Sequence, residues 1–255
     1  CIKTKYEFDK KIYFKAYKLV MKINVFLPCK RNSSRVKNKN KRKFADIDFG
    51  LVKIKLNHLI NSKLIDKIYL STNDLQIINY AKKLKKDKII IHQRKDNSLS
   101  TSNTTTQKLI NHASEIIPDG HILWTHVTSP FVNSKMYDEI ILRYKKVLKT
   151  NYDSLMTITK LKGFFWNKKG PINYDVKKKK WPKTQDTSAI NRINSGVFLS
   201  SRNNYIREKN RIGKKPFFYQ LSKLEGLDID EFEDFYFAEY IFKNKKKFLN
   251  KNYKT

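Results

Sequence analysis

Strand-like and helix-like segments alternate along most of this chain, and this alternation restricts the possible folds more than any single motif. Short apolar runs are followed by segments whose apolar residues recur three or four positions apart, as on one face of a helix. Such an order predicts an α/β sheet with helices on both faces. The predicted strands are residues 22–27, 67–71, 88–91, 121–127, 154–159 and 191–199. The predicted helices are residues 51–60, 75–84, 106–117, a helix capped by Asn133 or Ser134, and residues 232–242.

The length of the chain, 255 residues, suits a single domain with a real hydrophobic core. Met21 stands directly before the first predicted strand, and lysines interrupt any signal-peptide core upstream of it. We therefore expect residues 1–20 to be an extension that is not native, residues 21–250 to form the domain, and residues 251–255 to be a loose tail. Within the domain, residues 161–186 combine glycines, prolines, a lysine run and aromatic residues, which predicts an excursion from the sheet.

A formal net charge of +32 raises the question of a nucleic-acid partner. The lysines are spread along the chain, and no helix-turn-helix, zinc-finger or RNA-recognition pattern accompanies them. We expect no specific nucleic-acid partner and keep nucleic-acid binding as a third alternative, because the same positive field would attract an anionic nucleotide or sugar acid. Two cysteines give no disulfide framework, which suits a reducing compartment. No apolar run approaches the roughly 20 residues of a membrane span, so we expect no membrane insertion.

The first predicted strand leads into a polar loop, residues 28–40, that is rich in lysine, arginine and serine. Basic side chains neutralise phosphate charge, while hydroxyl and backbone N–H groups bond the phosphate oxygens. The loop is therefore a candidate phosphate site. The alternative is a solvated charge run on a lysine-rich protein, and the loop alone does not exclude it.

Two carboxylates near the C-terminus, Asp228 and Asp230, are separated only by Ile229. On a strand, residues two apart face the same side, so this pair could bind Mg²⁺ together with phosphate oxygens. The alternative is an acidic helix start, because Asp and Glu favour the first turn of a helix, and Asp234 fits that interpretation.

Residues 28–40 resemble the N-terminal signature of the acylneuraminate cytidylyltransferase family, the CMP-sialic acid synthetases. Four further stretches follow in the family's order: residues 71–74 (STND), 92–106 (HQR and a Ser/Thr run), 125–130 (THVTSP) and 227–239 (LDIDEFEDFYFAE). The resemblance spans about residues 22–242. It implies a Rossmann-like nucleotidyltransferase sheet, CTP as co-substrate, Mg²⁺ as cofactor, and a homodimer in which the excursion packs against the second subunit.

The resemblance also implies roles for individual residues. As catalytic residues it implies Lys39, which would hold the α- and β-phosphates, and Asp228 and Asp230, which would bind Mg²⁺. Around CTP it places Lys30, Ser33, Arg35, Lys39, Asn40, Arg94, and Thr106 or Thr104. Around the acidic sugar it places His126, Thr128, Ser129, Gln185 and Asn194.

This sequence departs from the family pattern at several of these positions. Lys30 stands where the family usually has Arg, Ser34 where it has Lys, and His126 where it has Gln. Lys183 and Thr184 stand where the family has an arginine pair. Neighbouring arginines can restore part of the charge, but a bidentate guanidinium is not equivalent to an ammonium. These departures leave the identity of the sugar acid open.

Residues and resemblance together predict a cytidylyltransferase. The enzyme would transfer CMP from CTP to a 2-keto-3-deoxy nonulosonic (sialic-type) acid and release pyrophosphate. The product would serve surface polysaccharide or lipopolysaccharide synthesis in a bacterial cytoplasm. The alternatives are a nucleotidyltransferase of the same fold for another sugar or nucleotide, and a catalytically weakened relative that only binds nucleotide.

Overall fold

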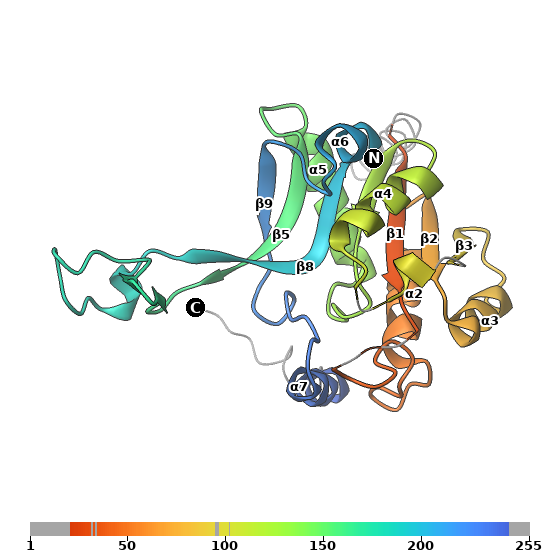
Figure 1. Cartoon of the computed structure of the whole chain (residues 1–255), viewed down its shortest axis with the longest axis horizontal. Coiled ribbons are helices and arrows are strands. Elements are labelled where there is room, and N and C mark those ends of the chain that lie inside the picture. Colours follow the sequence, from red (N-terminus) through yellow and green to blue (C-terminus); the bar gives the residue numbers. More distant parts are fainter. Residues whose placement is uncertain (1–20, 32, 34, 95–96, 102, 245–255) are drawn as a thin grey trace, which may run out of the picture.

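The computed structural model describes residues 21–244 except 32, 34, 95, 96 and 102, so the expectations for residues 1–20 and 251–255 lie outside the described residues. A seven-stranded sheet in the order β3-β2-β1-β4-β8-β5-β9 forms its centre (Figure 1). The strands are β1 (Ile23–Cys29), β2 (Lys67–Thr72), β3 (Ile89–Gln93), β4 (His121–Trp124), β5 (Ser154–Leu161), β8 (Ile190–Ser201) and β9 (Pro216–Gln220). The helices are α2 (Gly50–Asn61), α3 (Leu75–Lys83), α4 (Thr106–Ile116), α5 (Ser134–Val147), α6 (Arg202–Glu208) and α7 (Phe232–Lys243).

The predicted α/β sheet is confirmed, and most predicted elements agree with the structure within two residues. β4 is shorter than expected, so Thr125 and His126 belong to the loop that follows it. β1 is longer than expected and passes through Pro28. It pairs with β4 only as far as Phe26, so beyond that point Pro28 has a neighbouring strand on one side alone, where a proline is tolerated.

Helices cover both faces of the sheet, and each face has its own hydrophobic cluster. Side chains of β1 alternate between them: Val25 and Leu27 pack with α2, α3, α5 and α7, whereas Phe26 packs with α4 and α6. This alternation follows from the period of two along a strand. Among the described residues, no helix is both long and apolar enough to cross a membrane.

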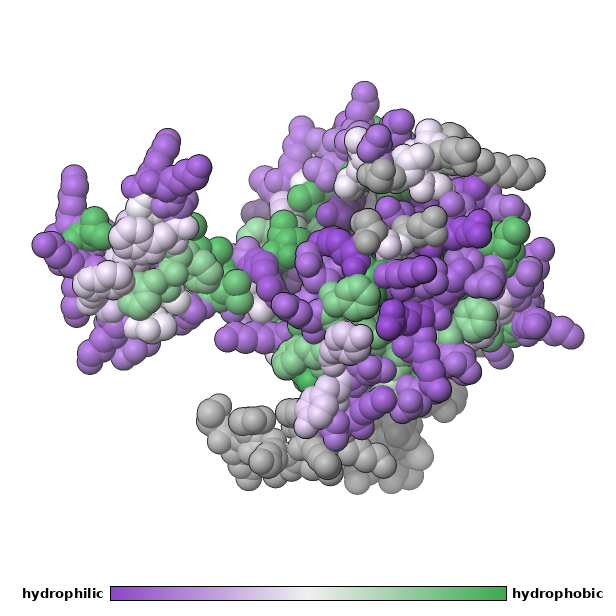
Figure 2. Space-filling view, turned by 60° about the horizontal axis from the view of Figure 1, so that its bottom comes forward, coloured by the Kyte–Doolittle hydropathy of each residue, from purple (hydrophilic) through white to green (hydrophobic). Residues whose placement is uncertain are grey.

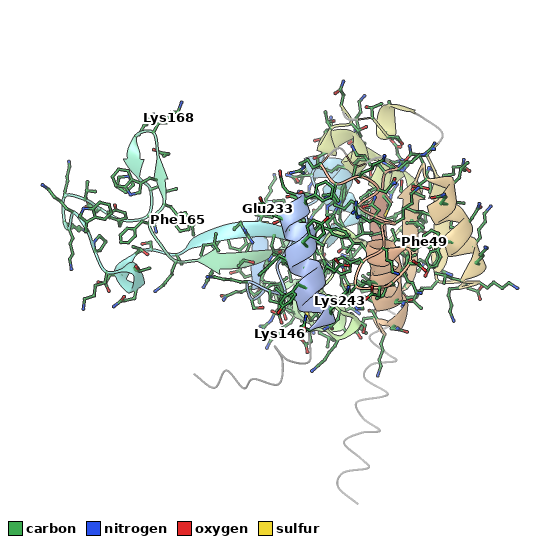
Figure 3. The ribbon with its side chains drawn as sticks, turned by 90° about the horizontal axis from the view of Figure 1, so that it is seen from below. Phe49, Lys146, Phe165, Lys168, Glu233 and Lys243 are labelled. Atoms are coloured by element: carbon green, nitrogen blue, oxygen red, sulfur yellow. The ribbon has the colours of Figure 1, made fainter. Side chains whose placement is uncertain are left out.

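β5 and β8 continue beyond the body of the sheet as a two-stranded arm (Figure 1). The outer part of the arm contains the small strands β6 (Trp166–Asn167) and β7 (Gly170–Pro171) and a short 3-10 helix, Thr184–Asp186. Seen from below, α7 crosses the underside of the body, while Phe165 and Lys168 lie far out on the arm (Figure 3). The arm therefore projects away from the sheet edge.

Candidate active site

The order of the strands creates a crevice between β1 and β4. In the sheet, β2 lies next to β1 on one side, and β4, which comes later in the chain, lies next to β1 on the opposite side. β1, β2, β3 and β4 run parallel, and open α/β sheets bind ligands at the carboxyl ends of strands where the order reverses. A cavity of about 210 Å³ lies at this point. It is lined by Pro28, Lys30, Ser33, Arg35, Lys39, Asn40, His126, Val127 and Thr128.

The loop after β1 is tied to the acidic segment by Lys39. This side chain is almost fully buried, and its Nζ donates to the carbonyl oxygen of Ile229 at 2.6 Å and, more weakly, to that of Asp230 at 3.4 Å. Burial lowers the pKa of Lys39, and the carboxylates Asp230 and Asp228 oppose this shift. Asn40 donates to the carbonyl oxygen of Lys30 at 2.9 Å and closes the loop on itself.

The expectation that Asp228 and Asp230 lie on a strand is wrong. Their segment is irregular and carries one backbone bond, from Ile229 N–H to the Thr128 carbonyl at 2.9 Å. Ile229 is fully buried, while Asp228 is partly buried and Asp230 is exposed. The helix α7 starts at Phe232, and Asp234 accepts hydrogen bonds from the N–H groups of Asp230 and Glu231. The acidic helix start therefore explains Asp234.

The two carboxylates differ in their surroundings. Oδ1 of Asp228 is buried and has no hydrogen-bond partner among the described residues. Burial, assisted by Asp230, raises the pKa of Asp228, whereas the Thr128 hydroxyl, Lys39 and Lys55 oppose the rise. Asp230 forms an ion pair with Arg35, with Nη2 2.8 Å from Oδ1.

This arrangement fits Mg²⁺. An unpaired buried carboxylate oxygen lies close to a second carboxylate, and Mg²⁺ takes one or two carboxylates together with phosphate and water oxygens. In the part of the chain that the structure describes, no group of three or more His, Cys, Asp or Glu side chains is arranged to hold a metal. Asp228 and Asp230 would thus be the protein ligands, and the substrate would supply the remainder.

Arg94 directly follows β3 and is not one of the residues that line the cavity. The guanidinium is buried near Cys29, and its Nη1 donates to the carbonyl oxygen of Leu99 at 2.5 Å. Its Nε and Nη2 have no hydrogen-bond partner among the described residues. Burial lowers the pKa of Arg94. Thr106, the first residue of α4, is exposed and outside the cavity.

The remaining predicted sugar-binding residues are separated from the cavity. Gln185 is exposed on the arm, in the 3-10 helix Thr184–Asp186. Asn194 is buried in β8, where its amide accepts from Thr157 Oγ1 at 2.6 Å and donates to Thr159 Oγ1 at 3.0 Å. These bonds join β8 to β5. Ser129 is buried below the cavity, and its Oγ has no partner among the described residues.

Sequence reasoning missed Lys55, which lies under the site. It is fully buried in α2 and donates to the Ser129 carbonyl at 2.7 Å and to the Tyr137 hydroxyl at 2.6 Å. Helical spacing could have revealed it, because Lys55 lies three positions after Val52 and four before Leu59 on the apolar face of α2. Two further residues, Trp124 and Arg211, pack next to His126 and carried no sequence signal of their own.

A larger cavity, about 780 Å³, lies on the other side of the basic loop. Lysines from the loop, α2 and α3 surround it. Phe49, which is labelled in Figure 3, stacks on Tyr80 with the two ring centroids 4.5 Å apart. The larger cavity shares no lining residue with the smaller cavity, where the predicted phosphate-binding loop meets the β4 loop and the carboxylates are close by. We therefore place the candidate active site at the smaller cavity.

Comparison with known proteins gives a consistent result. The family model described as cytidylyltransferase matches residues 25–251. Two pseudaminic acid cytidylyltransferases of Campylobacter jejuni are 21% and 22% identical over an alignment of 233 residues, and the matches cover 88% of this chain and 97% of each relative.

Solved structures show the same fold at low identity. CMP:2-keto-3-deoxy-manno-octonic acid synthetase complexed with CTP has a TM-score of 0.61 and 10% identity, and the match covers 88% of this chain and 99% of that one. 4-Diphosphocytidyl-2C-methyl-D-erythritol synthase from Anaerococcus prevotii has a TM-score of 0.58 and 12% identity, and the match covers 87% of this chain and 96% of that one.

Proposed function

Because the chain belongs to the cytidylyltransferase family, we propose that it transfers CMP from CTP to the anomeric hydroxyl of a 2-keto-3-deoxy nonulosonic acid and releases pyrophosphate. One observation carries the proposal: a cavity lined by cationic and hydroxyl donors lies at the strand switch point, close to two carboxylates. The relatives named for pseudaminic acid support this substrate class. The proposed setting is surface polysaccharide or lipopolysaccharide synthesis in a bacterial cytoplasm.

The basic loop would bind the triphosphate. Lys30, Ser33, Arg35 and Lys39 line the cavity and can all donate hydrogen bonds into it. Lysine has three donors, and the carbonyls of Ile229 and Asp230 take two of those on Lys39, which leaves one for a phosphate oxygen. Charge-assisted hydrogen bonds of this kind stabilise the charge that develops on the transferred phosphoryl group.

Asp228 and Asp230 would hold Mg²⁺ against the phosphates. When bound, the ion would neutralise oxygen charge and help align the α-phosphorus for in-line attack. Arg35 now pairs with Asp230, so this ion pair must open or rearrange when Asp230 takes up the cation. The two unpartnered donors of Arg94 would bind an acceptor on the nucleotide, and His126 and Thr128 would contact substrate from the β4 loop.

The chain would act as a homodimer through its arm. Trp166 and Trp181 on the arm stack on each other at 6.3 Å and are 55% and 67% exposed. Exposed aromatic residues clustered in this way mark association surfaces. A second subunit would also bring Gln185, which is remote from its own cavity, into reach of a substrate.

The decisive experiment measures pyrophosphate release from CTP and Mg²⁺ with N-acetylneuraminic, legionaminic, pseudaminic and Kdo acids. Turnover with a nonulosonic acid, and with CTP rather than UTP, GTP or ATP, would support the proposal. Preference for another nucleotide or for Kdo would indicate a relative of the same fold with a different substrate. CTP binding without turnover across the panel would favour a weakened relative.

The carboxylates are tested in the same assay. Asp228→Asn and Asp230→Asn should each reduce Mg²⁺-dependent turnover by about 10²-fold or more while the protein remains folded. Lys39→Ala should have a similar effect. Glu233→Gln, a neighbouring carboxylate in the first turn of α7, is the matched control and should keep normal turnover. Near-normal activity of Asp230→Asn would remove Asp230 from the cation site.

A further inference from the structure

His126 is held by a neighbour whose hydrogen-bonding role is fixed. Nε1 of Trp124 lies 2.8 Å from Nε2 of His126. An indole N–H can only donate, so Nε2 of His126 must accept. A neutral imidazole carries its proton on the other nitrogen when one is an acceptor. The contact therefore assigns the proton of His126 to Nδ1.

The ring stays neutral near pH 7. Burial, together with the positive charges of Arg211, Lys55 and Lys39, lowers the pKa of His126 to about 3. The guanidinium of Arg211 covers the ring of Trp124, with its carbon 5.4 Å from the ring centroid, and lies 3.7 Å from that of Phe198. Because Trp124 is almost fully buried, it cannot turn easily away from His126.

His126 also lines the cavity at the strand switch point. None of the described residues hydrogen-bonds its Nδ1, and the other polar side chains around the cavity are mainly donors. A neutral N–H at this position adds a donor without adding a charge. Its natural partner is an anionic oxygen of the ligand, either of a phosphate or of a sugar carboxylate.

We propose that His126 is a specificity-determining residue that offers a fixed Nδ1–H donor to an anionic substrate oxygen, and that Trp124 is the positioning residue that fixes this tautomer. The inference rests on the proposed function and deepens it, because it assigns a defined donor to one wall of the same site. A group that can only donate, such as an amide N–H or an ammonium, at that place on the ligand would meet a like donor and bind less well.

The first test needs no substrate. Nitrogen-15 NMR of the histidine side chains in the whole protein distinguishes an Nδ1–H ring from an Nε2–H ring and from a charged ring. His126→Leu identifies the signal among the five histidines. We expect the neutral Nδ1–H form between pH 6 and 8, and Trp124→Phe should shift the ring toward the Nε2–H form. An Nε2–H or charged ring in the wild-type protein would overturn the inference.

The second test measures binding. His126→Leu should weaken CTP or the sugar acid by about tenfold, whereas His126→Asn, which keeps an N–H near the Nδ1 position, should lose less. A change in KM for CTP would identify a phosphate as the acceptor, and a change for the sugar acid would identify its carboxylate. Unchanged values for both would overturn the specificity role.

The two tests remain separable from the proposed function. If no sugar acid is turned over, CTP titration followed at the His126 signal still shows whether the ring meets the nucleotide. The inference is wrong, even where the tautomer is as expected, if two results hold together. Neither CTP nor any sugar acid shifts the His126 signal, and neither binds less tightly to His126→Leu than to the wild-type protein. Trp124→Phe is not essential, because the wild-type tautomer can be measured alone.

Discussion

Lys55 places an ammonium group in the interior next to the candidate site. Its Nζ donates to the Ser129 carbonyl and the Tyr137 hydroxyl. Thr125 donates its only hydroxyl proton to the Gly196 carbonyl at 2.7 Å, so the contact between Tyr137 and Thr125 at 2.9 Å must be donated by Tyr137. Each residue in this buried chain of hydrogen bonds therefore donates to the next, from Lys55 in α2 through Tyr137 in α5 and Thr125 to the Gly196 carbonyl in β8. The chain lies beneath the loop that carries His126 and Thr128.

The titration of Lys55 should be visible in the stability of the protein. Burial lowers its pKa to about 7 from an ordinary 10.5, with Asp228 opposing the shift. Between these values the unfolded chain keeps a proton that the folded chain has released. The free energy of unfolding should therefore rise with pH between about 7 and 10.5. Below about pH 7 the folded protein keeps the buried charge, and its stability is reduced by the full cost of burying it.

Lys55→Met tests this prediction. The variant lacks the group, so its stability should rise less between pH 7 and pH 10 than that of the wild type, by an amount on the order of a few kcal/mol. Urea denaturation at several pH values measures the difference. Lys53→Met, on the same helix, should keep the wild-type profile. Equal pH profiles for both variants would show that Lys55 titrates normally.

At the scale of single residues, the sequence pointed to the residues of the basic loop but not to the buried side chains that pack next to the site. Lys39, Asn40 and Ser33 were predicted from the resemblance of the loop to the family signature, and they line the cavity. Asn194 was predicted for substrate, but tertiary pairing with Thr157 and Thr159 uses its amide. The hydrogen bond from Trp124 to His126 depends on where the two side chains lie in the folded protein. The periodicity of the sequence does not give these positions.

Gly50 determines how closely the basic loop approaches α2. A Cβ at this position would overlap the carbonyl oxygen of Arg42 and the Cβ of Phe44. The same stretch of loop is bound to α2 by the bond from Val52 N–H to the Asn40 carbonyl at 2.9 Å. A side chain at Gly50 would thus displace the backbone that carries Lys39 and Asn40.

We expect Gly50→Ala to destabilise the protein by about 1–3 kcal/mol, as overpacking does, and to weaken CTP binding together with it. Denaturant unfolding and CTP titration of the folded variant measure the two effects. Lys53→Ala, in the same helix, is the control and should change neither greatly. Wild-type stability and CTP affinity in Gly50→Ala would show that the close approach is not required.

At the scale of elements, helices and inner strands were predictable because their apolar residues keep a regular period over many positions. The structure adds α6 and β9, which the sequence did not indicate. β9 is a five-residue edge strand that begins at a proline, and its partner β5 lies far earlier in the chain. A short segment held mainly by distant pairing has little local signal. The acidic segment was wrongly predicted as a strand because the spacing of Asp228 and Asp230 does not show whether a partner strand is available; in the structure the Ile229 N–H bonds to the carbonyl of the loop residue Thr128.

The whole molecule presents aromatic surface on a projecting arm in spite of its large positive charge. Hydrophobic residues, in green, gather between hydrophilic tips of the arm (Figure 2). Trp166 and Trp181 belong to this surface, and Tyr236 and Tyr240 of α7 are also exposed. The excursion was predicted from composition alone, whereas its reach follows from the long pairing of β5 with β8.

The arm leads to a prediction about association. A dimer with two-fold symmetry uses the same patch twice, so each substitution acts at two places. Tryptophans that become buried in an interface are frequent hot spots, and Trp166→Ser combined with Trp181→Ser should raise the dimer dissociation constant by about 10²-fold or more.

Because each subunit carries a formal net charge of +32, salt should strengthen the wild-type dimer by screening repulsion between subunits. Sedimentation velocity at low and moderate salt measures both effects, and Leu75→Ser, at an exposed position on α3, is the control. A monomeric wild type under both conditions, or a double variant that dimerises as well as the control, would show that the arm is not an interface between copies.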